Sequence, residues 1–529
     1  MIVVGSGAAG GWAAKELTES GLSVLVLEAG PPIRVEQDFP LPAPNEGRLS
    51  ARLVHGITHQ PIQMRCPAFN ARTRRFFVDD REHPYTTPAD KAYNWFRGRQ
   101  VGGRMHTWGR VVARLSELEL RAASRDGHGN DWPLAYDDLA RAYDTVESFL
   151  GVSGCVDEVP SRAGTVVGGP SAMTRGETAF KAKVEAAFPG RRVIAARVAR
   201  RDRDRTPSTL RAAQQTGRMT LRGDALVRSI RTDPVSGRAT GVACIDRTTK
   251  QAFIASAKAV VLCASTVESV RILLNSACPR HPGGLGNAAG KLGLGITDHL
   301  LVGVGGPAPA ARGETDAPAS TDPYDFGTAT GIYIPRFRNV EESHPGFLRG
   351  YAIQGGIGRG PSWYLMAHGE MLSRPENRVV IDRARRDAWG IPAARIELAW
   401  SANEHAMIAD ALAVLRAMAH AAGLAIRNPP SGRPLETLTY RLWKNRLMAQ
   451  SGAFLPGSAM HELGGAAMGS DAATSVVDRW GRCWSAPNVI VADGACFPSG
   501  CSQNVTLTIL ALTVRACERL VDDYRSGSL

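Results

Sequence analysis

The first thirty residues constrain the fold more than any other part of the chain. Residues 2–4 are apolar and suit a strand covered on both faces, and they run directly into a glycine-rich turn, Gly5-Ser6-Gly7-Ala8-Ala9-Gly10. In such a turn the first glycine allows the tight bend, the second lets the backbone approach a pyrophosphate, and the third lets the following helix pack closely. A helix over about 9–20 and a strand over 22–27 are predicted next. This order is typical of a dinucleotide-binding domain.

The end of that second strand supports the same interpretation. Glu28 stands 18 residues after Gly10, close to the spacing of about 20 residues at which an acid binds the ribose hydroxyls of a dinucleotide. Ala8 and Ala9 lie where the first N–H groups of the helix point at the phosphates, and Ala29 follows the acid. The segment therefore predicts a bound dinucleotide cofactor.

Length, composition and charge restrict the classes of protein to which this chain can belong. At 529 residues and 44% hydrophobic, the chain is long enough for two or more domains, and it has no run of about 20 apolar residues that would span a membrane. The nucleotide-binding strand starts at residue 2 with no leader before it, so we expect a cytoplasmic protein. The net charge of +13 is dispersed and interleaved with acids, which argues against nucleic-acid binding.

The cysteines indicate reduced thiols. Nine cysteines, an odd number without zinc-like spacing, favour neither a disulfide framework nor a metal site. Cys496 and Cys501 form the one close pair, and ordinary buried side chains explain them better than a redox role.

Later segments predict further elements. We expect a helix over 133–151, short strands and a helix over 219–274, antiparallel strands over 325–400 and a helix ending at Gly423. Residues 31–95 are expected to form an extended segment that wraps the core or covers a site, and residues 305–323 are expected to form a loop.

Five segments, in one order along the chain, resemble those of the glucose-methanol-choline (GMC) family of flavoprotein oxidoreductases. They are VVGSGAAG with LEAG at 27–30, GRQVGGRMHTWG at 98–109, CASTVESVRILLNS at 263–276, GLGITDHL at 293–300, and the stretch from His461 to Thr508. The motif around 95–113 is most similar to bacterial glycoside and sugar oxidases, including the pyranose 2-oxidase-like group. The resemblance implies an FAD-dependent enzyme that oxidises a CH–OH group.

Pattern and resemblance together predict an α/β protein of two parts. The first is a Rossmann-like FAD-binding domain built from discontinuous segments, residues 1–45, 96–300 and 455–529. The second is a substrate-binding domain, residues 46–95 and 301–454, with an antiparallel sheet flanked by helices and with covering loops.

The chemistry requires a base beside the flavin. Oxidation of an alcohol removes the hydroxyl proton and passes a hydride from carbon to flavin N5, so a base of suitable pKa must lie within about 3 Å of the hydroxyl. Neutral histidine meets this need. The resemblance implies that His461 is the base and that Asn504, 43 residues later, is its partner, an amide that orients the substrate oxygen. His299, in TDHL, is expected at the junction of the domains.

The resemblance also implies the remaining contacts with FAD. Asp493 and Gly494 are expected near the ribityl and pyrophosphate groups, and Thr506 along the isoalloxazine. The other expected contacts are Gly102, Gly103, Thr107 and Trp108 near the flavin, and Leu226 and Val227 near the adenine through their main chain.

The chain departs from the family pattern in two places. Val505 stands where the family has a proline after its catalytic asparagine. Pyranose 2-oxidases carry FAD on a histidine just before the tryptophan of this motif, where this chain has Thr107, with His106 one residue earlier. We therefore predict noncovalent FAD.

The predicted substrate is a secondary alcohol of a sugar, glycoside or glycosylated natural product, which becomes a ketone. A non-sugar alcohol and a flavin-retaining lyase reaction are the alternatives. The electron acceptor is left open between oxygen, a quinone and an electron-transfer partner. A nicotinamide-dependent dehydrogenase would share only the first motif, and an inert flavin-binding protein would not need His461 and Asn504.

Overall fold

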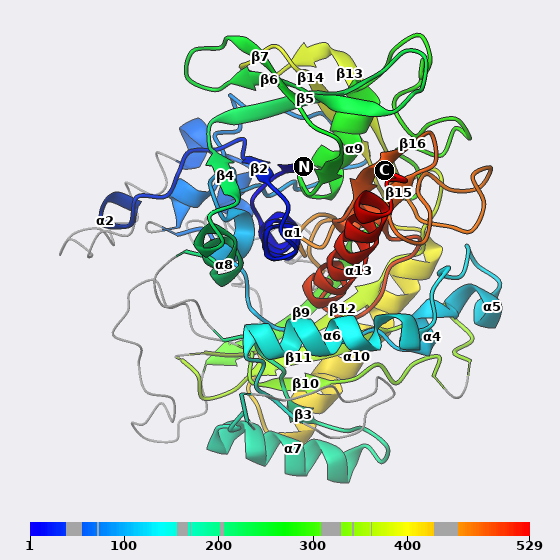
Figure 1. Ribbon diagram of the computed structural model, residues 1–529. Coiled ribbons are helices and arrows are strands. Elements are labelled where there is room, and N and C mark those ends of the chain that lie inside the picture. The colour runs from blue at the N-terminus through cyan, green and yellow to red at the C-terminus, as the bar shows by residue number, and fades with distance from the viewer. Residues whose placement is uncertain are drawn as a thin grey trace.

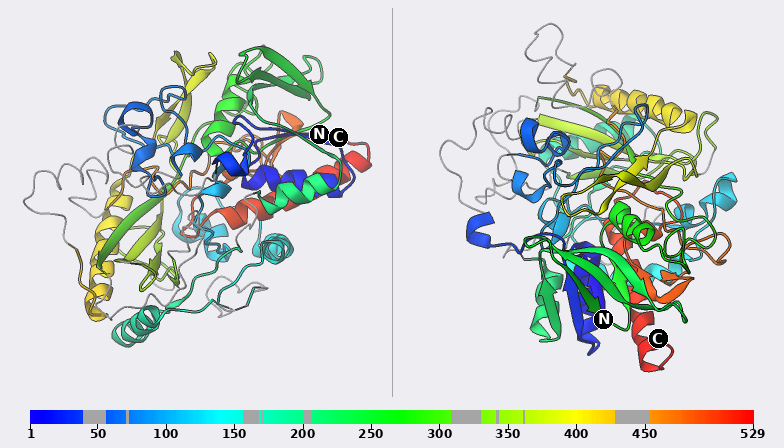
Figure 2. Two further views of the ribbon diagram at one scale, coloured as in Figure 1. Left: turned by 90° about the vertical axis from the view of Figure 1, so that its left-hand side faces the viewer. Right: turned by 90° about the horizontal axis from the view of Figure 1, so that it is seen from above.

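The computed structural model describes residues 1–38, 56–70, 73–155, 168–169, 171–200, 206–307, 330–340, 343–360, 362–427 and 453–529. A parallel sheet occupies the half that holds both termini, and an antiparallel sheet occupies the other half (Figure 1). The N- and C-termini lie close together in each view (Figure 2). The predicted α/β class, with a parallel sheet in one part and an antiparallel sheet in the other, is confirmed.

The parallel sheet is assembled from distant parts of the chain. Its strands run in the order β15-β16-β8-β1-β2-β4, and only the β15–β16 pair is antiparallel. Helix α1 (Ala8–Glu19) lies between α8 (Ser208–Gln215) and α13 (Thr506–Arg525) beside this sheet. The strands are apolar because both faces are covered. They are β1 (Ile2–Val4), β2 (Val24–Leu27), β4 (Met219–Arg222), β8 (Val260–Leu262), β15 (Arg482–Cys483) and β16 (Ala486–Val491).

The antiparallel sheet has the order β3-β10-β11-β12-β9. Helix α10 (Ala402–Ala421), which starts with a capping box at Ser401 and Glu404, packs on β9 and β12, and α7 (Arg175–Ala187) contacts α10. These elements enclose a second hydrophobic core. The strands are β3 (Ile194–Ala195), β9 (His299–Pro307), β10 (Ile332–Ile334), β11 (Tyr351–Gly356) and β12 (Ser362–Glu370).

Two smaller sheets lie on the side of the parallel sheet, away from the antiparallel sheet (Figure 1). One is β5 (Ala225–Thr232), β6 (Ala239–Asp246) and β7 (Ala252–Ser256); the other is the hairpin of β13 (Arg378–Arg386) and β14 (Pro392–Glu397). Helix α9 (Thr266–Asn275) packs against both β5 and β13. The stretch 219–233 thus supplies strands to two sheets, because the chain turns at Asp224, whose φ is +53°.

Other predicted elements agree in kind and differ at their ends. The helix expected over 133–151 is α6 (Tyr136–Leu150), which ends at Gly151 with a φ of +57°. The remaining helices are short: α2 (Val35–Asp38), α4 (Glu117–Leu120), α5 (Ala122–Asp126), η1 (Gln63–Arg65), η2 (Arg74–Phe76), η3 (Gly103–His106) and η4 (Gly494–Cys496).

Some sequence predictions reach beyond the described residues. Of the loop predicted over 305–323, residues 305–307 end β9 and the rest lies outside. Residues 39–55 and 71–72 of the predicted extended segment lie outside as well. The division of the chain into two domains stays a prediction; β3, from the segment assigned to the FAD-binding domain, pairs with β10 in the other.

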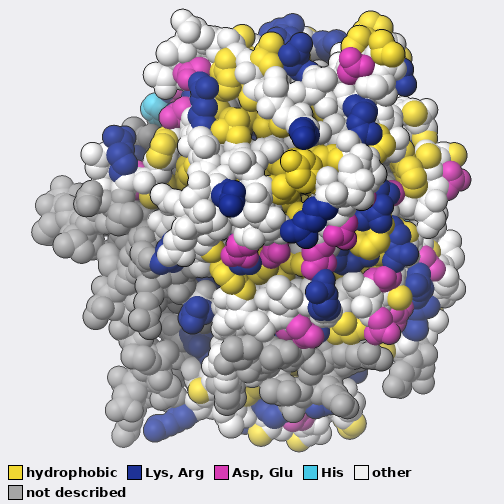
Figure 3. Space-filling model, in the orientation of Figure 1, with side chains coloured by type: hydrophobic (Ala, Val, Ile, Leu, Met, Phe, Trp, Pro, Cys, Tyr) yellow, Lys and Arg dark blue, Asp and Glu magenta, His cyan; other side chains and the backbone are white. Residues whose placement is uncertain are grey.

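The apolarity of the helices and the distribution of surface charge concern two kinds of partner, a membrane and a nucleic acid. In the described part of the chain, no helix combines the length and apolarity needed to cross a bilayer. Basic and acidic side chains are intermixed on the face shown in Figure 3, as expected for a solvated surface rather than a nucleic-acid-binding patch.

Candidate active site

The turn after β1 requires its glycines. Gly5 has a φ of +94°, and a Cβ there would lie 2.4 Å from the carbonyl oxygen of Cys263. A Cβ on Gly10 would lie 1.9 Å from the carbonyl oxygen of Gly5, so the helix could not approach the strand. A Cβ on Gly7 would meet no atom within 4 Å, because this position faces open space. Gly5 and Gly10 therefore serve packing, and Gly7 leaves room for a ligand.

The N-terminus of α1 is free to bind an anion. Its N-cap residue is Gly7, no side chain caps it, and its first turn contains no acid. Backbone N–H groups at a helix start, with the positive end of the helix dipole, favour phosphate.

Glu28 has a structural role that the sequence did not reveal. Its carboxylate accepts hydrogen bonds from the backbone N–H of Ser6 (3.0 Å), the hydroxyl of Ser6 (2.6 Å) and the N–H of Gly30 (3.0 Å). Burial raises the pKa of Glu28, and these hydrogen bonds oppose the rise. Glu28 thus holds the glycine-rich turn in shape while it borders the cavity described next.

A cavity of about 280 Å³ extends from this turn to the C-terminal part of the chain. Segments around 4–9, 95–109, 225–227, 263–272, 459–462, 493–494 and 505–509 form its wall, so residues far apart in the sequence meet there. The predicted site residues on the wall are Gly5, Gly7, Ala8, Ala9, Glu28, Ala29, Gly103, Thr107, Trp108, Leu226, Val227, His461, Asp493, Gly494 and Thr506.

Three predicted site residues do not border the cavity: Gly10, Gly102 and Asn504. Gly10 is packed against Gly5, as described above. Gly102 faces His106, whose Nε2 would lie 2.6 Å from a Cβ there. Asn504 lies next to Val505 and Thr506, which do border the cavity.

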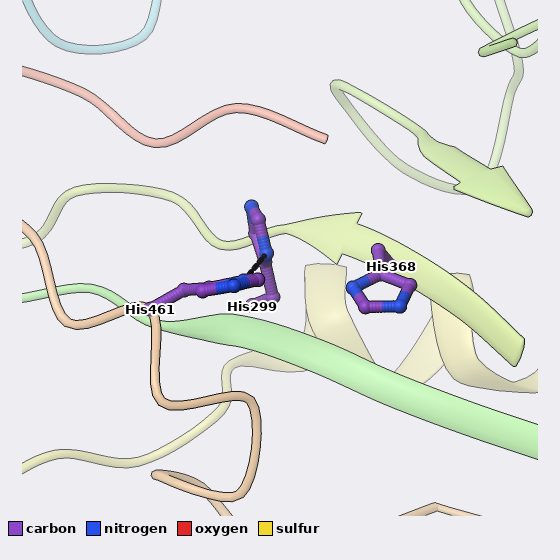
Figure 4. A group of neighbouring side chains, drawn as sticks. All are labelled: His299, His368 and His461. Carbon is purple, nitrogen blue, oxygen red and sulfur yellow. Dashed lines mark hydrogen bonds between the residues drawn. The ribbon is translucent and has the colours of Figure 1, made fainter. Parts of the chain in front are cut away.

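His461 is held by two contacts. Its Nδ1 lies 2.7 Å from Nδ1 of His299, with the two rings at 87°, and its backbone N–H donates to Asp298 at 3.0 Å (Figure 4). Burial lowers the pKa of His461 well below its usual value, and nearby His299 and His368 lower it further. The ring is therefore neutral, and its Nδ1 is occupied by His299.

Arg104 binds residues on both sides of His461 in the sequence. It donates to the carbonyl of Met460 (2.9 Å) and the hydroxyl of Ser265 (3.0 Å), and it pairs with Glu462 at 3.1 Å. Met460 and Ser265 have φ values of +60° and +75°, a conformation that costs non-glycine residues about 1–2 kcal/mol. Arg104 therefore holds strained backbone directly before His461.

Asn504 is oriented from the antiparallel sheet. Its Oδ1 accepts a hydrogen bond from Nε2 of Gln354, a buried residue on β11. The amide nitrogen of Asn504 thus remains for another acceptor.

Other predicted groups lie nearby. Asp493 accepts hydrogen bonds from the hydroxyl of Ser269 and from the N–H of Ala495, and burial raises its pKa to about 6. Cys496 and Cys501 form no disulfide; the thiol of Cys496 donates to the carbonyl of Asp493, and the sulfur of Cys501 lies 3.8 Å from Nε2 of His299.

Comparison with known proteins agrees with this geometry. Residues 2–301 match one GMC oxidoreductase family model, and residues 373–513 match a second. The chain belongs to the GMC oxidoreductase family. The predicted family and enzyme class are confirmed, and GMC flavoproteins bind FAD.

The relatives are distant but cover the whole chain. The chain is 25% identical to 2-methyl-1,2-propanediol dehydrogenase from Mycolicibacterium austroafricanum, over 98% of this chain and 94% of the relative. It is 27% identical to paromamine 6'-oxidase from Streptomyces fradiae, over 99% and 92%. Its fold is similar to that of formate oxidase from Aspergillus oryzae RIB40, studied for FAD modification, with a TM-score of 0.68, 14% identity and coverage of 99% and 98%.

The residues of this GMC oxidoreductase fit FAD. The uncapped start of α1 suits the pyrophosphate, open space at Gly7 lets the backbone contact it, and Glu28 offers a carboxylate at the cavity wall. Thr107 borders the cavity, whereas Nε2 of His106 hydrogen-bonds to the carbonyl of Val101 and its ring stacks on Phe76.

Sequence reasoning missed several groups around His461. The sequence places His299 only at the domain junction, although the Asp-His pair in TDHL is a signal that could have identified it. Arg104 lies inside the GRQVGGRMHTWG motif, and the motif indicates no separate role for it. Gln354 and His368 carry no signal in the sequence, because only the pairing of distant strands brings them here.

Proposed function

We propose that this enzyme oxidises a secondary alcohol of a sugar, glycoside or glycosylated natural product to a ketone, with noncovalently bound FAD. The observation that carries the proposal is the pairing of His461 with His299 at the wall of the cavity. Similarity to paromamine 6'-oxidase supports a glycoside substrate. The contacts of His106 with Val101 and Phe76 support noncovalent FAD, because they engage the histidine of this motif elsewhere. A cytoplasmic location stays a prediction.

The tautomer of His461 follows from the hydrogen bond. A neutral imidazole carries one proton, and a base at Nε2 needs that proton on Nδ1. Nδ1 of His299, at 2.7 Å, is then the acceptor, and its own proton stands on Nε2, toward Cys501. His461 Nε2 accepts the substrate hydroxyl proton in this arrangement.

Asn504 holds the substrate oxygen. Because Gln354 donates to its Oδ1, its amide nitrogen donates to the substrate oxygen and stabilises the negative charge that develops as the proton leaves. FAD, when bound, supplies the two-electron acceptor for the carbon centre. The uncharged amide fixes orientation without competing for the proton.

A non-sugar alcohol is the second candidate substrate. Similarity to 2-methyl-1,2-propanediol dehydrogenase, over nearly the whole chain, favours it. The same residues would act in the same roles, so substrate screening must include small diols beside sugars and glycosides.

The visible spectrum of the purified protein tests the proposal. We expect a yellow protein whose FAD is released by acid precipitation, and anaerobic titration with a panel of sugars, glycosides and diols should bleach it. Reoxidation on admitting air would identify oxygen as an acceptor. Binding and turnover of a substrate without bleaching would instead support a lyase, and a protein that cannot take up FAD would refute the proposal.

His461→Ala tests the base. The variant should lose substrate-dependent flavin reduction by about 100-fold or more, the usual contribution of a positioned base, with FAD content unchanged. Near-normal reduction by this variant would exclude His461 as the base.

A further inference from the structure

Three histidines meet beside the cavity. Strands β9 and β12 are antiparallel, with His368 opposite Leu301 and Glu370 opposite His299. His299 and His368 are therefore diagonal neighbours on one face of the sheet, and His461 approaches them from the loop after Ala453 (Figure 4). One ring nitrogen of each lies within 4.8 Å of the others. They are 69 and 93 residues apart in the sequence, so no spacing indicated the cluster.

His368 has no role in the proposed reaction. It is 8% exposed, and its Nδ1 has no hydrogen-bond partner in the described part of the protein. A buried polar atom left unpaired destabilises the folded protein. A bound ligand at the cluster would remove this destabilisation.

All three rings are in the form that binds metals. Burial lowers the pKa of His299 to about 4 and of His368 to about 3, and it lowers the pKa of His461 well below its usual value. Neutral imidazole is the commonest protein ligand of transition metals.

We propose that His299, His368 and His461 form a binding site for a divalent transition metal ion, with Zn²⁺ the best match, and that the bound ion switches the enzyme off. Zn–N bonds of about 2.0–2.1 Å place tetrahedral nitrogens about 3.3 Å apart. To reach this geometry, the Nδ1 atoms of His299 and His461, which are 2.7 Å apart, separate slightly, and the ring of His368 moves toward them. The fourth position is left to water, as in open zinc sites.

Metal binding and base catalysis exclude each other at His461. If Nδ1 of His461 binds the ion, its proton moves to Nε2, and the ring remains neutral. Nε2 then carries a proton and cannot accept one from the substrate. The binding does not depend on the proposed function; the inhibition rests on it.

Zn²⁺ binding by the FAD-loaded protein tests the site directly. Equilibrium dialysis with zinc analysis should find about one tightly bound Zn²⁺ per chain. His368→Gln should weaken binding at least about tenfold, the lower end of what loss of even a supporting residue costs a metal site. The matched control is His420→Gln, on the exposed side of α10, which should bind Zn²⁺ like the unchanged protein.

Two further readouts keep the test decisive. Co²⁺ in the unchanged protein should give an intense ligand-field difference spectrum that Zn²⁺ abolishes, a result that holds even if His368→Gln fails to fold. Once a bleaching substrate is known, Zn²⁺ should block flavin reduction in the unchanged protein, and His368→Gln should resist this block at least about tenfold more strongly. Equal Zn²⁺ binding by His368→Gln and the unchanged protein, or no Co²⁺ signal, would overturn the site. Zn²⁺ binding at the cluster without inhibition would leave the site standing and refute the switch.

Discussion

Replacing His299 tests the hydrogen bond that sets the tautomer of His461. His299→Leu removes the acceptor at 2.7 Å from Nδ1 of His461 and replaces it with a buried apolar side chain of comparable size. His299→Asn is the matched variant, because its amide oxygen reaches approximately the position of Nδ1 and still accepts a hydrogen bond. His299 is 2% exposed, so solvent does not replace the lost partner on that side, whereas His461 is partly exposed where it borders the cavity.

The size of the effect follows from the unpaired proton. Without His299, the tautomer of His461 with its proton on Nδ1 points a donor at the introduced apolar side chain and leaves it unsatisfied, which costs about 1–3 kcal/mol. The population able to act as a base at Nε2 falls accordingly. At 1.36 kcal/mol per factor of ten, the rate constant of flavin reduction should fall about 5- to 160-fold in His299→Leu. In His299→Asn it should stay within about threefold, since the acceptor remains.

Anaerobic stopped-flow measurement of flavin bleaching provides the assay. The rate constant at saturating substrate reports the base, while the substrate concentration at half saturation should change little, because His299 does not contact substrate in the proposed arrangement. FAD content and thermal unfolding identify variants that are merely misfolded. If folded, FAD-loaded His299→Leu reduces flavin as fast as the unchanged protein, the tautomer argument is refuted.

Three other predictions concern the cofactor turn and the amide. Glu28→Ala leaves Ser6 and Gly30 donors unpaired, so FAD should dissociate more easily and the protein should lose about 2–5 kcal/mol of unfolding free energy, measured by FAD release and denaturant titration. Gly7→Ala should leave the FAD-free protein as stable as before and weaken FAD binding at least about tenfold, because the added Cβ lies in the open space that we assign to FAD. Gly10→Ala should instead fail to fold, because its Cβ would lie 1.9 Å from the carbonyl oxygen of Gly5. Equal effects of the two substitutions would contradict this distinction. Gln354→Leu frees the Asn504 amide to rotate, so flavin reduction should slow about 2- to 12-fold at normal FAD content; an unchanged rate would remove Gln354 from the mechanism.

Local sequence was sufficient where neighbours in the chain are also neighbours in space. The β1–α1–β2 unit needs only apolar strands, three glycines and an acid at the right spacing, and all of these lie within 28 residues. The helix end at Gly151 follows from an equally local signal, a glycine that adopts a left-handed conformation. The resemblance to the GMC family extended the predictions to His461 and to residues that line the cavity.

Tertiary structure decided what surrounds His461. Within the described residues, its immediate partners come from β9, β12 and η3, and Asn504 is held by β11. These contacts depend on which strands pair and in which register, and a shift of one residue would turn His368 and Gln354 to the opposite face. The sequence by itself therefore determined the cofactor-binding unit and, through the family resemblance, indicated His461 as the proposed base. The folded chain determined the protonation partner of that base, the orientation of the amide and the cluster of three histidines, because long-range strand pairing is a property of the whole core rather than of any segment.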